Sequence, residues 1–206
     1  LGTQVEYPMV EAIQELSQYT GLDIQAIIPF ELGAGNTILP LDAANRLDIV
    51  LVDADYAGRA IPELSQTIAA ITGHPLWPAA ICDPWGNRLI LKTAPSGLVA
   101  ERIGKMISLV TKCPDPMGTC AHAGFILRGS QVKHLAVPGT LSLALEVGAA
   151  INGARQGNMD TLKAATQALD GWVLFTGMVT RKDWESRDGY MFGTTFIKGT
   201  GDFEGQ

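Results

Sequence analysis

Two carboxylates, Asp53 and Asp55, stand at the end of an apolar run, and Gly58 and Arg59 follow them in the segment V-D-A-D-Y-A-G-R-A-I-P-E-L of residues 52–64. Side chains two positions apart on an extended chain point the same way, so we expect both carboxylates on one side. They repel each other unless a cation, Arg59 or a shared proton lies between them. They would then bind a divalent metal, or act as a base and its orienting partner. The alternative is an Asp–Arg ion pair that stabilises a turn and caps the next helix.

A second segment, F-E-L-G-A-G-N at residues 30–36, contributes Glu31, Gly33, Gly35 and Asn36. It follows a predicted strand and precedes a predicted helix. Glycines there let backbone N–H groups approach a ligand, and a helix N-terminus favours an anion. Because ligands of open α/β sheets bind beside the carboxyl ends of adjacent strands, we expect both segments to border one crevice. The alternative is a tight turn capped by Asn36.

Other polar residues are weaker candidates. Glu63 falls on the predicted first turn of the next helix, where it complements the helix dipole or faces Arg59. The spacing C-x6-C-x-H of Cys113, Cys120 and His122 matches no standard zinc pattern. A Cys–His nucleophile pair at the last two positions would lack a third, orienting group.

Alternating strand and helix patterns through residue 170 predict an α/β fold, with a parallel or mixed sheet and helices on its faces. From Gly171 two strands follow without a helix between them, which indicates the start of an incomplete β-rich module. The predicted domains are therefore residues 1–170 and 171–206. The predicted helices are 9–20, 37–46, 62–72, 96–109, 141–156 and 160–169, and the strands before residue 170 are 22–29, 48–54, 76–82 and 88–93, with a hairpin of 119–127 and 131–137.

Composition excludes several classes of protein. The net charge is −6 and no Lys/Arg cluster occurs, which argues against nucleic acid as a partner. No apolar run is long enough to span a membrane. Three cysteines are too few for a disulfide framework and predict a reducing, cytoplasmic location. The first residue is not Met and the last residues read as a loop, so we expect a fragment of a longer protein.

Both polar segments resemble the S-methyl thiohydantoin desulfurase family. E-L-G-A-G-N at 31–36 and D-A-D-Y-A-G-R-A-I-P-E-L at 53–64 carry the resemblance, and V-P-G-T-L-S-L-A-L-E-V-G at 137–148 and F-T-G-M-V-T at 175–180 extend it. The family more usually reads E-I-G-G-G-N at the first segment, so Ala34 is a departure that adds a methyl group near any ligand. Members of the family are longer at both ends, so from the resemblance we expect this chain to lack the family's glycine-rich N-terminal loop and most of its C-terminal β domain.

The resemblance implies an enzyme of hydantoin breakdown, often beside hydantoinase/oxoprolinase subunits, that replaces a methylthio group on a hydantoin-like ring by oxygen. For that reaction Asp53 or Asp55 would be the base or a metal ligand, while Arg59 and the amides of residues 33–36 would hold the edge of the ring. Glu31 completes the predicted catalytic set, and Gly58 and Glu63 the predicted substrate-binding set. No cofactor is assigned, although a divalent metal at the two aspartates is considered.

Two other functions stay open at this stage. The chain is a non-catalytic subunit if Asp53, Asp55 and Glu31 pair off in a solid core, and a ligand-binding regulator if a glycine-rich crevice lacks a base. Self-association is expected, because hydrophobic residues make up 47% of the chain.

Overall fold

The computed structural model describes residues 5–111, 120–187 and 190–206. The chain divides into two compact units, Leu1–Ser142 and Leu143–Gln206. The predicted domain boundary after residue 170 falls inside the second unit and stays a prediction. Among the described residues, none of the helices is both long and apolar enough to cross a lipid bilayer.

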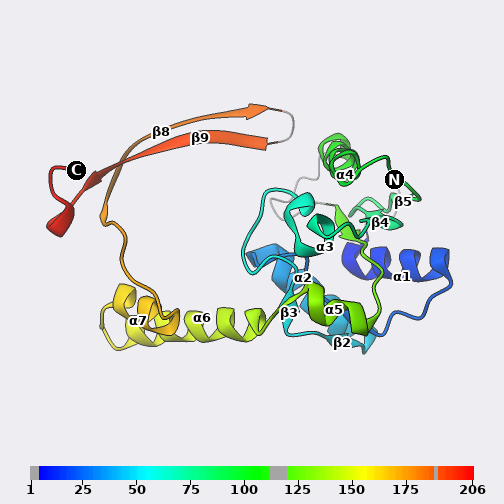
Figure 1. Ribbon diagram of the computed structural model, residues 1–206, viewed down its shortest axis with the longest axis horizontal. Helices are drawn as coiled ribbons and strands as arrows, with labels where there is room; N and C mark the ends of the chain where they lie inside the picture. The colour runs from blue at the N-terminus through cyan, green and yellow to red at the C-terminus, as the bar shows by residue number, and fades with distance from the viewer. Residues whose placement is uncertain (1–4, 112–119, 188–189) are drawn as a thin grey trace. The chain divides into compact units, whose positions relative to one another are not determined.

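The predicted α/β class is confirmed, but the strands form several small sheets in place of one large sheet (Figure 1). The elements of the first unit are α1 (Pro8–Thr20), β1 (Ala26–Ile27), α2 (Ala34–Leu47), β2 (Val50–Leu51), β3 (Ala54–Asp55), η1 (Leu64–Gln66), α3 (Ile68–Ile71), β4 (Ala79–Cys82), β5 (Arg88–Leu91), α4 (Gly97–Thr111), β6 (Ala121–Ala123), α5 (Gly129–Leu135) and β7 (Val137–Pro138). Then come α6 (Thr140–Gln156), α7 (Thr161–Ala168), β8 (Gly177–Arg187), β9 (Tyr190–Gly199) and η2 (Gly201–Phe203).

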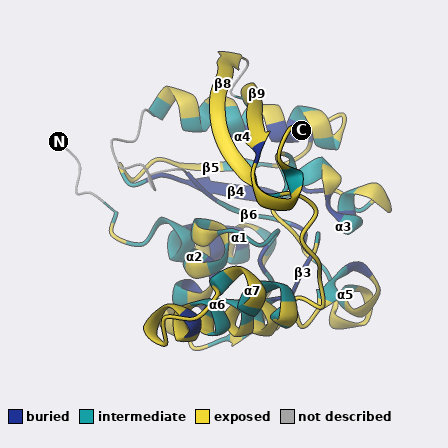
Figure 2. Ribbon diagram, turned by 90° about the vertical axis from the view of Figure 1, so that its left-hand side faces the viewer, coloured by how far each residue is buried: buried dark blue, intermediate teal, exposed yellow. Residues whose placement is uncertain are grey.

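The first unit is organised around an antiparallel sheet of order β5-β4-β6. Figure 2 shows α1 on one face of this sheet and α4 on the other. All four residues of β4 are buried, and they alternate between the two faces. Ala80 and Cys82 pack against Ala12 and Leu16 of α1, whose spacing of four residues aligns them on one side of the helix. The helix ends at Gly21, which adopts a left-handed conformation with φ of 68°.

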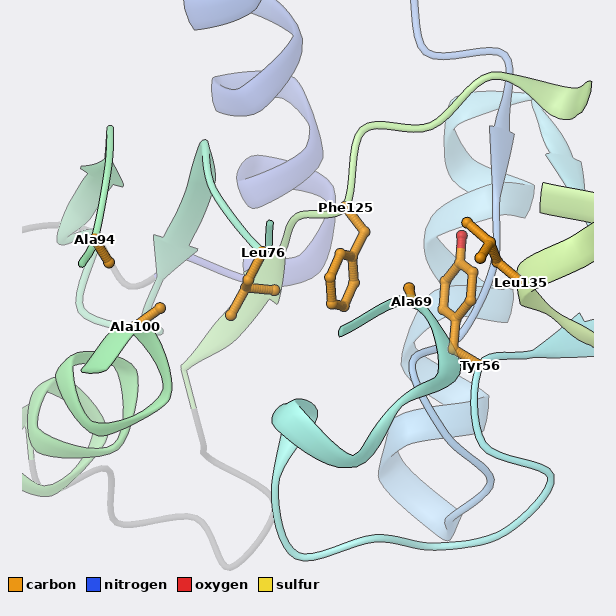
Figure 3. Close-up of a cluster of buried hydrophobic side chains, with 7 residues drawn as sticks. All are labelled: Tyr56, Ala69, Leu76, Ala94, Ala100, Phe125 and Leu135. Carbon is orange, nitrogen blue, oxygen red and sulfur yellow. The ribbon is translucent and has the colours of Figure 1, made fainter. Parts of the chain in front are cut away.

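A second hydrophobic cluster joins the sheet to the loops that carry the acidic segments (Figure 3). The Phe125 ring lies between Leu76 and Tyr56, and its centroid is 5.8 Å from that of Tyr56 and 5.7 Å from that of Phe30. Such tilted and edge-on aromatic pairs add to the free energy gained by burial. The backbone next to Asp55 is therefore fixed through the buried side chain of its neighbour, Tyr56.

Two smaller sheets border those loops. Strands β1 and β2 pair in parallel, Ala26 opposite Val50, and strands β3 and β7 pair in antiparallel fashion, Asp55 opposite Val137. Each of these strands is two residues long, so the strands satisfy few of the backbone N–H groups around them.

The predicted hairpin of residues 119–127 and 131–137 is wrong, because residues 129–135 form helix α5. The segment Arg128-Gly129-Ser130 resembles a turn in sequence, but it begins a helix. The Gln131 side chain accepts a hydrogen bond from the Arg128 N–H at 2.9 Å, which satisfies a donor that the helix start leaves open.

The predicted helix of residues 62–72 is replaced by η1 and the single turn of α3. Thr67, which is fully buried, separates the two, and its hydroxyl oxygen accepts a hydrogen bond from the Ala70 N–H. Helix α3 therefore starts at an N-cap in the middle of the predicted helix.

In the second unit, β8 and β9 form the two strands predicted after Gly171. Every described residue of β8 is exposed (Figure 2). Trp184, Met191 and Phe192 are among the exposed large apolar side chains of this hairpin.

A substitution at Gly104 tests the packing of α4 on the sheet. A Cβ atom at Gly104 would lie 2.7 Å from Cε1 of His122, whereas one at Gly97 of the same helix would meet no atom within 4 Å. We expect Gly104→Ala to lower the free energy of unfolding by about 1–3 kcal/mol, because the imidazole is packed in the core. Gly97→Ala should change it by less than about 0.5 kcal/mol. Urea unfolding of both variants measures this, and equal stabilities would contradict the packing.

Candidate functional site

The acidic and glycine-rich segments lie close together at the ends of β1 and β2. The Val52 N–H donates to the Ile27 carbonyl at 2.9 Å, which extends the parallel pairing by one residue. Beyond the strands, the Glu31 carboxylate accepts hydrogen bonds from the Asn36 side chain and from the Ile61 N–H. One carboxylate therefore holds the two loops against each other.

The glycine-rich segment forms the start of α2. Gly33 is the residue before the helix; its N–H donates to Thr37 Oγ1 at 3.1 Å and its carbonyl accepts from the Thr37 N–H. Gly35 lies in the first turn. Asn36 does not cap the helix, since its side chain donates to Glu31. The other first-turn amides belong to the group that a helix leaves without intrahelical acceptors.

Asp53 binds the N-terminus of α6. Its Oδ1 accepts hydrogen bonds from the Leu141 and Ser142 N–H groups, both at 3.0 Å, and its Oδ2 accepts from the Ser142 hydroxyl at 2.6 Å. These bonds, first of all that of the Ser142 hydroxyl, lower the pKa of Asp53. A carboxylate at this position also complements the positive end of the helix dipole. Asp53 is thus the cap of a helix that begins 87 residues further along the chain, the difference between positions 53 and 140.

Asp55 has no solvent exposure and folds back on its own loop. Its Oδ1 accepts hydrogen bonds from the Ala57 N–H at 2.9 Å and the Gly58 N–H at 2.5 Å. Its Oδ2 is buried and has no hydrogen-bond partner within the described part of the chain. A buried carboxylate oxygen in this condition is rare in folded proteins.

The remaining predicted residues flank this loop. Gly58 has φ of 71°, and a Cβ there would touch Val137, so glycine is required by conformation. The Arg59 Nε donates to the carbonyl of Ala60 at 2.9 Å, and within the described ranges Arg59 forms no ion pair with either aspartate. Glu63 precedes η1 and accepts from the Ser65 hydroxyl at 2.9 Å.

The donors present do not fit a divalent metal at the aspartates. Asp53 and Asp55 accept hydrogen bonds from different parts of the backbone. Over residues 5–111, 120–187 and 190–206, no three His, Cys, Asp or Glu side chains gather as a metal would require.

A small cavity of about 10 Å³ between α4 and the central sheet has room for about one water. Its lining includes Glu101, which is not among the predicted site residues, and His122, which the sequence offered only as a weak zinc or nucleophile-pair candidate. Glu101, which is buried, accepts from the Leu64 N–H at 3.0 Å and pairs with Lys105. His122 points to the same side of the sheet; its Nε2 is buried and unpartnered among the described residues. Burial, together with the charge of Lys105, lowers the pKa of His122 to about 4. The feature of the sequence that could have indicated this cavity is the pair of small residues Ala100 and Gly104, which let α4 lie close to the sheet.

The cysteines form no site in the described residues. Cys82 is buried, and burial raises its pKa to about 12, which makes the thiol unreactive. The Cys120 sulfur lies 3.6 Å from the Thr111 hydroxyl. Cys113 lies outside the described residues, so the zinc site considered for Cys113, Cys120 and His122 stays untested.

Comparisons with known proteins cover nearly the whole chain. The family model described as S-Me-THD-like, N-terminal domain, matches residues 3–93, and that of the C-terminal domain matches residues 100–206. A crystal structure of a protein from Chromobacterium violaceum is similar to this chain, with a TM-score of 0.64 and 26% identity. The similarity covers 85% of this chain and 48% of that protein, so this chain spans about half of its length. No curated protein matches the chain.

The Asp53 cap predicts a pH-dependent contribution to stability. Because its pKa in the folded protein lies below the ordinary 3.8, the carboxylate stabilises the fold above that pH, and the effect is lost as the pH falls through the folded-state pKa. Asp53→Asn should therefore be less stable than the wild type at pH 7, and the difference should narrow as the pH falls below 3.8, as measured by urea unfolding. Ser142→Ala should shift the stability in the same direction by less. A stability difference that persists unchanged to pH 2.5 would exclude this role.

His122 predicts a second pH effect in a different window. Its pKa of about 4 lies below the ordinary 6.5, so the unfolded chain takes up a proton first and stability falls as the pH drops from 6.5 toward 4. His122→Gln should remove about 1–3 kcal/mol of this loss. His134→Gln, at an exposed position on α5, should retain the whole of it. Identical pH profiles for the two variants would show that His122 is not buried as a neutral group.

Proposed function

We propose a function on the premise that the chain belongs to the S-Me-THD-like family, that of the S-methyl thiohydantoin desulfurases. The proposed reaction replaces the methylthio group of an S-methyl thiohydantoin-like ring by oxygen. Water adds to the ring carbon of the C=N bond, the carbon–sulfur bond breaks, and methanethiol leaves. The ring then carries a carbonyl at that carbon and an N–H at the neighbouring nitrogen.

The observation that supports this proposal is that the two carboxyl oxygens of Asp55 differ in their hydrogen bonds. Backbone amides hold Oδ1 in place, and Oδ2 has no hydrogen-bond partner in the described chain. A positioned carboxylate with one oxygen that accepts no hydrogen bond could serve as the general base for a water that reaches it. In the proposed reaction Asp55 takes a proton from the attacking water and passes it to the departing thiolate.

The other residues are given supporting roles. Both carboxylate oxygens of Asp53 accept hydrogen bonds from the start of α6. We therefore assign Asp53 to holding the loop of residues 52–64 and not to proton transfer. Arg59 and the first-turn amides of α2, at Gly35 and Asn36, would stabilise the negative charge that develops on the ring nitrogen. Glu31 would fix the distance between these two groups of donors, through its bonds to Asn36 and Ile61.

A second candidate function is that of a non-catalytic subunit beside a hydantoinase/oxoprolinase. Two observations favour it. The carboxylates of Asp53 and Glu31 are engaged by hydrogen bonds within the chain. In addition, the β8–β9 hairpin exposes Trp184, Met191 and Phe192, which would suit contact with another subunit or with a second copy. A cytoplasmic location remains a prediction for either function.

Substitution of Asp55 tests the first candidate. Asp55→Asn retains an oxygen that accepts from Ala57 and Gly58 but removes the base, so we expect the rate of methanethiol release from an S-methyl thiohydantoin to fall by about 10²–10⁴. Asp42→Asn, which alters only a surface ion pair with Arg46, is the matched control. Methanethiol is followed with a thiol reagent, and circular dichroism verifies folding.

Unchanged turnover in the folded Asp55→Asn protein would remove Asp55 from the mechanism. Turnover that appears only when a hydantoinase/oxoprolinase subunit is added, and that is the same for wild type and variant, would favour the second candidate function.

A further inference from the structure

The cavity of about 10 Å³ between α4 and the central sheet is lined by none of the residues that take part in the proposed reaction. Its walls come from different layers of the first unit. Ala100, Glu101 and Gly104 belong to α4, whereas Ile81 belongs to β4 and His122 to β6. A cavity of about 10–15 Å³ holds one water molecule. The volume therefore admits water and excludes an organic ligand.

Two polar side chains line this cavity, and the other described residues of the lining are aliphatic or glycine. His122 Nε2 is buried and has no hydrogen-bond partner within residues 5–111, 120–187 and 190–206. Glu101 is also buried, with 8% of its surface exposed. Buried polar atoms of folded proteins nearly always have a partner, either in the protein or in an ordered water. The imidazole nitrogen therefore indicates a polar ligand in the cavity.

The Glu101 carboxylate can accept one more hydrogen bond. Its Oε2 accepts from the Leu64 N–H at 3.0 Å, and its Oε1 lies 3.4 Å from Lys105 Nζ. A carboxylate has about four lone-pair sites, so these contacts leave room for a further donor. A neutral imidazole offers either an N–H or a lone pair at Nε2, according to its tautomer. Water fits both tautomers, because it donates two protons and also accepts.

The charges around the cavity favour a neutral ligand over a small cation. Burial, and after it the charge of Lys105, lowers the pKa of His122 to about 4, so the imidazole is neutral at pH 7. Lys105 also pairs with Glu101, which is the carboxylate of the lining. An ammonium or metal ion in the cavity would lose its hydration and would be repelled by the Lys105 ammonium. Water avoids both costs.

We propose that the cavity is a binding site for one ordered water molecule, which joins Glu101 of α4 to His122 of β6. The water donates one proton to the Glu101 carboxylate. At His122 Nε2 it either donates its second proton or accepts from the N–H. Two partners are at the lower end of the about two to four that a buried water has.

The water also links the central sheet to the acidic segment of residues 52–64. Glu101 and Lys105 hold the end of that segment, since Glu101 accepts from the Leu64 N–H and Lys105 Nζ donates to the Pro62 carbonyl at 3.3 Å. A water that fixes the Glu101 carboxylate therefore steadies the hydrogen bond to Leu64. The site stands on the cavity and its polar lining, and it does not depend on Asp55 being a base.

A crystal structure of the whole chain tests the proposal, from crystals grown without ammonium salts or added metal ions. We expect density for one water within about 2.7–3.2 Å of both His122 Nε2 and a Glu101 oxygen. In solution, nuclear Overhauser effects between water and the His122 ring protons should have the sign of a water that stays bound longer than the protein takes to tumble. A dry cavity, a direct bond between His122 and Glu101, or a metal ion at that position would overturn the proposal.

Variants at His122 separate the water from the packing of the ring. His122→Leu removes one of its two partners, so we expect the water to be lost and the Leu64 amide to exchange its hydrogen about two- to tenfold faster, the effect of one weakened hydrogen bond. His122→Gln restores a polar end group and should retain the water. His134→Leu, at an exposed position of α5, is the matched control and should change neither.

The proposal fails if the Leu64 amide exchanges equally fast in His122→Leu and His134→Leu, or if the water persists unchanged in His122→Leu. Should His122→Leu not fold, the density in the wild type and in His122→Gln decides the question.

Discussion

Carboxylates that accept backbone N–H bonds hold the irregular parts of this fold together. Several strands of the first unit are only two residues long, so many peptide N–H groups near the loops have no partner in a sheet. Asp53 accepts from the start of α6, Asp55 from its own loop, Glu31 from Ile61, and Glu101 from Leu64. An unsatisfied buried N–H costs about 1–3 kcal/mol, so removal of the carboxylate of Asp55 or Glu101, which are buried, would carry a penalty of that size.

This constraint changes how the acidic segment is interpreted. A D-x-D pair at the end of a strand suggests that both carboxylates serve one reaction, but here the two accept hydrogen bonds from different parts of the chain. Both carboxylate oxygens of Asp53 accept hydrogen bonds from the start of α6, and the Ser142 hydroxyl lowers the pKa of Asp53. Asp55 is anchored through one oxygen and leaves the other without a partner. The proposed reaction therefore depends on one oxygen atom, and the rest of the segment maintains the backbone that presents it.

The second unit poses a different physical problem. A two-stranded hairpin buries little apolar surface by itself and is at best marginally stable in water. The β8–β9 hairpin nevertheless exposes several large apolar side chains, among them Trp184 and Met191. Cover for these side chains would stabilise the hairpin, which is why association is part of the second candidate function.

The sequence by itself determined what depends on neighbouring residues. Helices α1, α4, α6 and α7 were predicted because apolar spacing and caps lie within each segment, and the family was evident because its motifs are contiguous. Only the tertiary structure decided that residues 129–135 are helical, that the strands divide into small sheets, and that Asp53 and Asp55 differ. The residue that caps α6, Asp53, lies 87 positions before the first residue of that helix, Thr140. The cavity beside Glu101 and His122 is lined by residues of both α4 and the central sheet. Such partners are brought together by burial of distant side chains, and no local pattern in the sequence records that pairing.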